Sequence, residues 1–191
     1  LDGSIYISRK SRKFILDYTI DQLKVTGDHL KAFEINSFLN FGSIEADRIK
    51  SLVRFNTDGD IQGSLSVADV KLFGLKNRLL CESERIETRI DVTPDAVRLS
   101  VLPFDLSSPS ARLSLEFLDQ LKKDRCSIEF RGSQIDIGQS RQMALAFFKN
   151  SETVETLFDV LRGGTGKTIQ VGFTAPRLAD LFDENRLTLS G

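Results

Sequence analysis

The stretch CSIEFRGSQIDI, residues 126–137, alternates apolar and polar side chains, as a strand with one buried face does. Helical periodicity follows it up to Arg162, and a second strand pattern, TIQVGF, occupies residues 168–173. This order predicts a sheet with helices packed against it. The stretch holds no pattern of residues typical of a catalytic site.

The same alternation recurs upstream. The turn signal Thr93-Pro94-Asp95 separates two alternating segments and predicts an antiparallel hairpin. One side of every segment is apolar, which favours a sheet with a single covered side over a parallel sheet buried on both. Glycine-serine pairs open three of the strand patterns, at Gly3, Gly63 and Gly132, and suggest bends in a long sheet. The alternating segments are residues 14–20, 86–92, 97–101 and 111–117.

Helices are expected only in the C-terminal third. One is predicted from the N-cap Ser151 to Arg162, a shorter one precedes it and ends at Asn150, and a third covers residues 176–182. The predicted fold class is therefore α+β: a predominantly antiparallel, curved, one-sided β-sheet with a few helices in the C-terminal third. We expect residues 1–191 to be a single segment of a longer envelope protein, because the chain has no initiator Met. Residues 1–137 would be mainly β-sheet, and residues 138–191 a helix-strand-helix-strand part.

Composition narrows the function classes. The 191 residues carry a formal net charge of −1, so no global field recruits nucleic acid or an anionic membrane. No apolar run is long enough to span a bilayer. Cys81 and Cys126 lack the spacing of a zinc site, and two interpretations of them stay open: two buried small apolar residues, or a disulfide, which would imply an oxidising compartment.

Three patterns resemble chemical sites without meeting their requirements. The sequence GGTGKT at residues 163–168 has a P-loop composition, but a helix precedes it and a strand follows, which is the reverse of a phosphate-binding loop. The sequence NTDGD at residues 56–60 lacks both end ligands of a calcium loop and predicts a turn at Asp58-Gly59. His29, the single histidine, has no partner motif for nucleophilic catalysis. We therefore predict no enzyme activity, no catalytic or metal residues and no cofactor; a carboxylate-based hydrolase would require several of the scattered carboxylates to converge in one cleft.

In the C-terminal third a strand pattern leads into helices, and further strand patterns follow. The segments that carry this arrangement are residues 135–137, 160–164, 169–173, 178–181 and 185–191. The arrangement resembles the AsmA-like superfamily of large bacterial envelope proteins, most clearly over residues 128–191. The resemblance implies an inner-membrane anchor outside this segment and a long, periplasmic, repeated β-groove whose apolar interior carries phospholipid acyl chains.

The resulting functional expectation is non-catalytic. We expect a periplasmic segment that supports phospholipid transport between membranes, or outer-membrane homeostasis, through an apolar β-groove. Its expected partners are phospholipid acyl chains and flanking repeats of the same polypeptide, without nucleic acid or nucleotide. The alternative is a structural or protein-interaction β-module with no lipid role, and a cytoplasmic location applies if the resemblance fails. Residues that would line the groove, or else a closed core, are Ile90, Val92, Leu99, Val101, Leu113 and Leu115.

Overall fold

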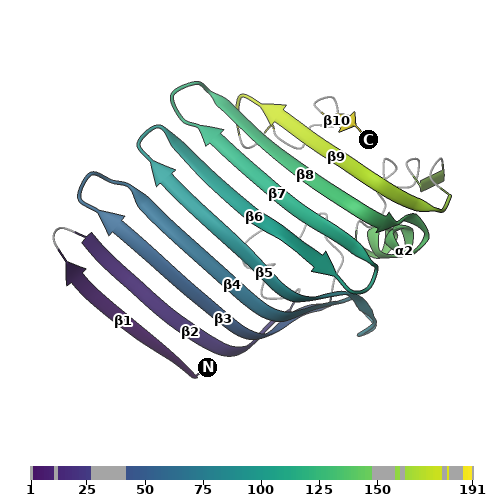
Figure 1. Ribbon diagram of the computed structural model, residues 1–191, viewed down its shortest axis with the longest axis horizontal. Coiled ribbons are helices and arrows are strands. Elements are labelled where there is room, and N and C mark those ends of the chain that lie inside the picture. Colours follow the sequence, from purple (N-terminus) through teal and green to yellow (C-terminus); the bar gives the residue numbers. More distant parts are fainter. Residues whose placement is uncertain are drawn as a thin grey trace.

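The computed structural model describes residues 2–10, 13–26, 42–147, 158–159, 162–177, 180 and 187–190. Within these residues the chain forms one open antiparallel sheet of ten strands, whose spatial order is the order of the sequence (Figure 1). The strands are β1 (Asp2–Lys10), β2 (Lys13–Thr26), β3 (Ser43–Asn56), β4 (Ile61–Phe73), β5 (Leu79–Thr93), β6 (Ala96–Leu106), β7 (Ala111–Gln120), β8 (Arg125–Asp136), β9 (Thr165–Ala175) and β10 (Leu187–Ser190).

Tight turns explain why neighbours in sequence are neighbours in space. Between β3 and β4 the Asn56 side-chain oxygen accepts hydrogen bonds from the backbone N–H groups of Asp58 (3.0 Å) and Asp60 (2.8 Å), and Gly59 takes a φ of 90°. Between β5 and β6 the Thr93 hydroxyl accepts the backbone N–H of Ala96 at 3.1 Å. Both predicted hairpins, at Asp58-Gly59 and at Thr93-Pro94-Asp95, are therefore confirmed.

The prediction of an α+β class overstated the helical content. Among the described residues the one helix with defined bounds is α2 (Ile137–Phe147), which corresponds to the helix predicted to end at Asn150. The chain then returns to the same sheet, because β9 pairs with β8 from Asp136↔Thr165 to Cys126↔Ala175. The fold is therefore dominated by the sheet. The predicted helix over residues 151–162 lies largely outside the described residues, and so does much of the one over residues 176–182.

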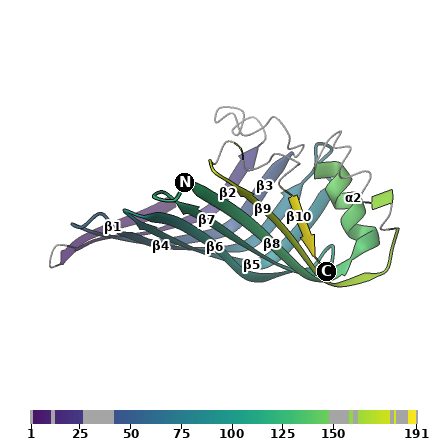
Figure 2. The ribbon, with the colours of Figure 1, turned by 90° about the horizontal axis from the view of Figure 1, so that it is seen from above.

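The sheet is curved, and α2 lies on its concave side (Figure 2). Three residues inside strands, Gln22, Asp69 and Gln134, have φ values of 58°, 52° and 55° and are absent from the pairing ladders of β2, β4 and β8. The register is the same on both sides of each of these residues, so they interrupt the ladder without inserting an extra residue. The register shifts lie elsewhere, between Leu72 and Phe73 and between Val101 and Phe104.

Few apolar side chains of the described residues are fully buried: Ala46, Ile49, Leu106, Ala111, Cys126 and Ala175. The densest cluster is Cys126 with Ala175, against which Phe117, Ile128 and Phe173 pack. Both cysteines are free: Cys126 is buried, while Cys81 is half-buried and pairs with Leu72 near the opposite end of the strands. The interpretation of Cys126 as a small buried apolar residue is confirmed, and no disulfide joins the two cysteines.

Candidate functional site: the concave face

Directly paired residues of an antiparallel sheet lie on the same face, so the register identifies what each face presents. One row of directly paired residues crosses eight strands and is apolar throughout. We call it the central apolar row. Its ends continue in register to Ile7 of β1 and Leu187 of β10. The row consists of Leu16, Val53, Gly63, Ile90, Leu99, Phe117, Ile128 and Phe173.

A second apolar row lies two residues further along each strand and on the same face. It passes through Leu65, Val101, Leu115, Phe130 and Val171, with Thr88 between Leu65 and Val101. From β4 to β9 the residues of the two rows are half-buried, except Phe130, which is 39% exposed. Gly63 belongs to the row but has no side chain. The described residues therefore leave a broad apolar surface open on this face.

All six residues predicted for the groove fall on this face. Ile90 pairs with Leu99 in the central apolar row, and Val101 pairs with Leu115 in the next. Val92 lies two residues beyond Ile90 on β5, and Leu113 pairs with Phe104 of β6. The register thus brings the six together, while their role in lipid binding stays a prediction.

Five large apolar residues of the row were not among the predicted groove residues: Leu16, Val53, Phe117, Ile128 and Phe173. All of them except Val53 lie in strand patterns that the sequence had indicated, so the signal for the correct face was present. What the sequence lacked was the pairing of strands that places these residues in line with Ile90 and Leu99.

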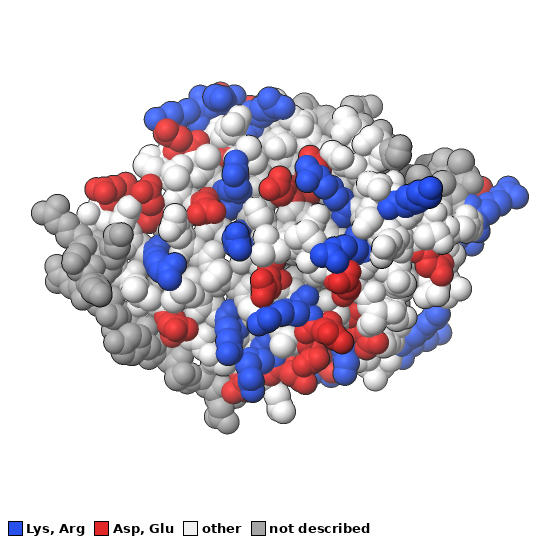
Figure 3. Space-filling view, viewed as in Figure 1, with Lys and Arg blue, Asp and Glu red and all other residues white. Residues whose placement is uncertain are grey.

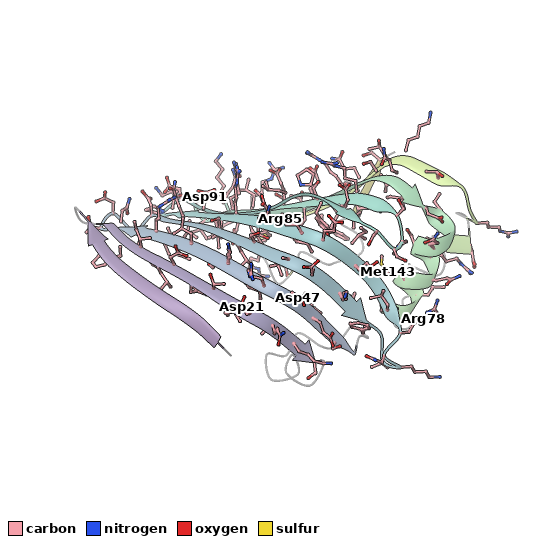
Figure 4. The ribbon with its side chains drawn as sticks, turned by 60° about the horizontal axis from the view of Figure 1, so that its bottom comes forward. Asp21, Asp47, Arg78, Arg85, Asp91 and Met143 are labelled. Carbon is pink, nitrogen blue, oxygen red and sulfur yellow. The ribbon has the colours of Figure 1, made fainter. Side chains whose placement is uncertain are left out.

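The opposite, convex face is charged (Figure 3). Figure 4 shows the side chains of Arg85 and Asp91 projecting from this side. Ion pairs cross neighbouring strands, for example Arg48 to Asp21 at 3.1 Å, with side chains more than half exposed. Exposed pairs of this kind contribute about 0–1 kcal/mol each, so this face is best described as a solvated surface of mixed charge.

Helix α2 stands at one end of the concave face. Asp136 caps it, because its carboxylate accepts the backbone N–H of Gln139 at 2.9 Å and the side-chain amide of Gln139 at 3.0 Å. From there the helix reaches the turn between β4 and β5, where Arg78 donates to the Gln142 side chain at 3.0 Å. Figure 4 places Met143 of α2 at the same end as Arg78. The helix therefore closes one end of the face and leaves the apolar rows of the middle open.

The dimensions of the face suit an extended hydrocarbon chain. Strand β6 has 11 residues, which span about 37 Å at about 3.4 Å per residue. Half of a bilayer's hydrocarbon core, the length that one acyl chain covers, is about 15 Å. An acyl chain lying along the strands would therefore fit within the face with room to spare.

The described residues offer little for other chemistry. They contain no cluster of three or more histidine, cysteine or acidic residues able to hold a metal ion. No helix among them has the length and apolarity needed to cross a membrane. His29 lies outside the described residues, and Gly164 connects to β9, where its carbonyl accepts the backbone N–H of Ile137 at 3.0 Å.

Comparison of the chain with protein-family models, with curated proteins and with solved structures finds no match. We therefore infer function from the geometry of the two faces and from the chemistry of their residues.

Proposed function

We propose that the concave face binds the acyl chains of phospholipids, and that this chain is a non-catalytic, periplasmic segment of an AsmA-like envelope protein. Its role would be to support phospholipid movement between membranes or outer-membrane homeostasis. The observation that carries the proposal is the central apolar row, which crosses eight strands and is only half-buried by the described residues. Large open apolar surfaces on soluble proteins commonly mark interaction sites.

Hydrocarbon chains are the occupant that fits this surface best. The apolar rows contain aliphatic and aromatic side chains with few polar groups, so they offer contact area without directional hydrogen bonds. Each methylene group transferred from water onto such a surface contributes about 0.8 kcal/mol, and a flexible chain can follow a curved face. A folded protein partner would have to match that curvature with a rigid surface.

The second candidate is a structural or protein-interaction β-module. It is favoured by β1, a strand of nine residues at the edge of the sheet, whose outer side is paired with no other strand among the described residues. Such an edge can pair with a strand of another segment. Because this candidate assigns no ligand to the concave face, lipid binding separates the two.

The deciding experiment is native mass spectrometry of the chain expressed in an oxidising host and purified without detergent, followed by lipid extraction. The proposal predicts phospholipid bound at defined stoichiometry. A lipid-free protein that also fails to take up phospholipid from vesicles would contradict it and favour the β-module.

A further inference from the structure

The two edges of the sheet differ in length. Among the described residues β1 forms one edge and β10 the other, and they have nine and four residues. Every residue of β1 pairs with β2, from Asp2↔Asp21 to Lys10↔Lys13, without a break in the register. Proteins commonly protect a sheet edge with a proline, a bulge or a very short strand, and β1 has none of these. Its outer side therefore presents a regular row of backbone groups to which a further strand can pair.

The sequence of β1, DGSIYISRK, is complementary to its own reverse. Two copies of the strand that run in opposite directions and share Tyr6 as their centre bring opposite charges together at both ends. Hydroxyl groups then meet hydroxyl groups, and aliphatic residues meet aliphatic residues on either side of the centre. The resulting pairs are Asp2 with Lys10, Gly3 with Arg9, Ser4 with Ser8, Ile5 with Ile7, and Tyr6 with Tyr6.

The geometry of antiparallel pairing favours this register. Backbone groups along a strand alternate between its two neighbours, so every second residue of β1 turns its N–H and C=O away from β2. Centring on Tyr6 pairs odd-numbered residues with odd-numbered ones, and even with even, so the outward groups of both strands meet. It also keeps the same face of the sheet on the same side in both copies. Moving the centre to Ile5 or Ile7 shortens the ladder and leaves Lys10 or Asp2, respectively, outside it.

The same register continues the apolar face from one copy to the other. Ile7 pairs with Leu16 at the end of the central apolar row, and Ile5 pairs with Tyr18 on the same face. With Ile7 of one copy opposite Ile5 of the second, the apolar sides of the two sheets adjoin. A partner strand of unrelated sequence would not in general supply both this match and the opposite charges at the ends. A second copy therefore fits this edge best.

We propose that β1 pairs antiparallel with β1 of a second copy of this chain, about a two-fold axis at Tyr6, so that the two sheets join into one. The interface of a two-fold dimer uses the same surface of both copies, and each contact occurs twice. The contact between Asp2 and Lys10 therefore forms at both ends of the joint. This inference goes beyond lipid binding and does not depend on it.

Cysteine cross-linking of the full chain measures the register directly. Tyr6→Cys places two thiols opposite each other, with Cα atoms about 4.5–5.5 Å apart, a separation that a disulfide spans. Mild oxidation should therefore convert most of this variant to a covalent dimer. Ser8→Cys is the matched control, because its two thiols would lie about 14 Å apart along the strands. A mixture of Ser4→Cys with Ser8→Cys should cross-link, although neither variant does so alone.

Charge reversal tests the partner independently. Asp2→Lys alone, or Lys10→Asp alone, places like charges opposite each other at both ends of the joint. Each should raise the dissociation constant of the dimer about tenfold in sedimentation velocity. An equimolar mixture of the two variants restores opposite charges at both ends, so it should form a mixed dimer with wild-type affinity. Circular dichroism checks that every variant folds.

Two outcomes would overturn the proposal. The first is a chain that stays monomeric at every concentration and does not cross-link through Tyr6→Cys. The second is a dimer that persists in both charge variants and cross-links Ser8→Cys as readily as Tyr6→Cys, because the copies would then associate through another surface or register. Neither readout involves lipid, so failure here leaves the proposed function standing, and a lipid-free chain leaves the β1 joint standing.

Discussion

The two faces of the sheet are built by the same strands, yet their chemistry is opposite. On β7 the residues Leu113, Leu115 and Phe117 point to one side, while Arg112 and Glu116 belong to the other. The apolar residues of the first side are mostly half-buried, whereas most charged residues of the other side are exposed. The difference teaches that the same strands build one face that is hydrated and another whose apolar side chains the described residues cover only in part.

An open apolar face is costly in water unless something covers it. Burial of apolar surface contributes about 25 cal/mol per Å², so a lipid that covered several hundred Å² would be held by many kcal/mol of gross hydrophobic free energy. The convex face needs no such cover, because its ion pairs and charged side chains remain hydrated. We therefore predict that polar substitutions on the concave face will weaken lipid binding, whereas substitutions on the convex face will leave it unchanged.

The largest expected effect comes from a carboxylate placed on the concave face of β7. Leu113→Glu should reduce phospholipid loading about tenfold or more, because a charge next to acyl chains loses its hydration. Leu118→Glu puts the same side chain on the convex face, beside Arg98, and should leave loading unchanged. Phospholipid loading is quantified by mass spectrometry, and circular dichroism checks that each variant folds. An equal loss of loading in both variants would contradict the functional difference between the faces.

The next effect concerns the two cysteines. Burial raises the pKa of the Cys81 thiol to about 11 from an ordinary value of 9.0. Its thiolate fraction at pH 8, and with it the alkylation rate, should be about a hundredfold below that of an ordinary thiol and should rise as the pH approaches 11. Burial, and secondarily the charge of Asp119, raise the pKa of Cys126, which is fully buried. Cys126 should therefore react only on unfolding.

Peptide mapping after iodoacetamide treatment between pH 7 and pH 10 distinguishes the two sites. Rapid labelling of Cys81 at pH 7 would contradict the environment described for it.

The smallest expected effect tests the packing of the central apolar row. A Cβ added at Gly63 would lie 2.5 Å from Cγ2 of Ile90, too close for any real contact. Gly63→Ala should therefore lower the free energy of unfolding by about 1–3 kcal/mol, as overpacking does. Gly163→Ala, where no atom lies within 4 Å of the added Cβ, serves as the control. Chemical denaturation measures both, and equal stability of the two variants would show that Ile90 moves aside freely.

The sequence predicted the strands well because alternation is a local property. The segments 86–92, 97–101 and 111–117 carry the pattern in full, and Thr93-Pro94-Asp95 identifies the hairpin between the first two. The face on which each apolar residue lies follows from the same alternation. This is why all six predicted groove residues share one face, although their register could not be derived without the pairing of strands.

Other features gave weaker signals or none. The cap formed by Asp136 and Gln139 has the spacing of a helix start and was overlooked because strand alternation continues to Ile137. Pro103 inside a strand pattern signals a bulge, and it lies at the register shift of β6 against β7 between Val101 and Phe104. By contrast, the positive φ of Gln22 and Gln134 has no signature in the sequence, since glutamine rarely adopts that conformation.

The most direct test of the central claim is photo-crosslinking with a phospholipid that carries a diazirine at mid-length of one acyl chain, followed by peptide mapping. The account predicts adducts on the concave face, at Ile90, Leu99, Val101 and Leu115, that compete away with unlabelled phospholipid. Adducts confined to convex-face residues such as Leu52 and Leu118, or spread equally over both faces, would contradict it.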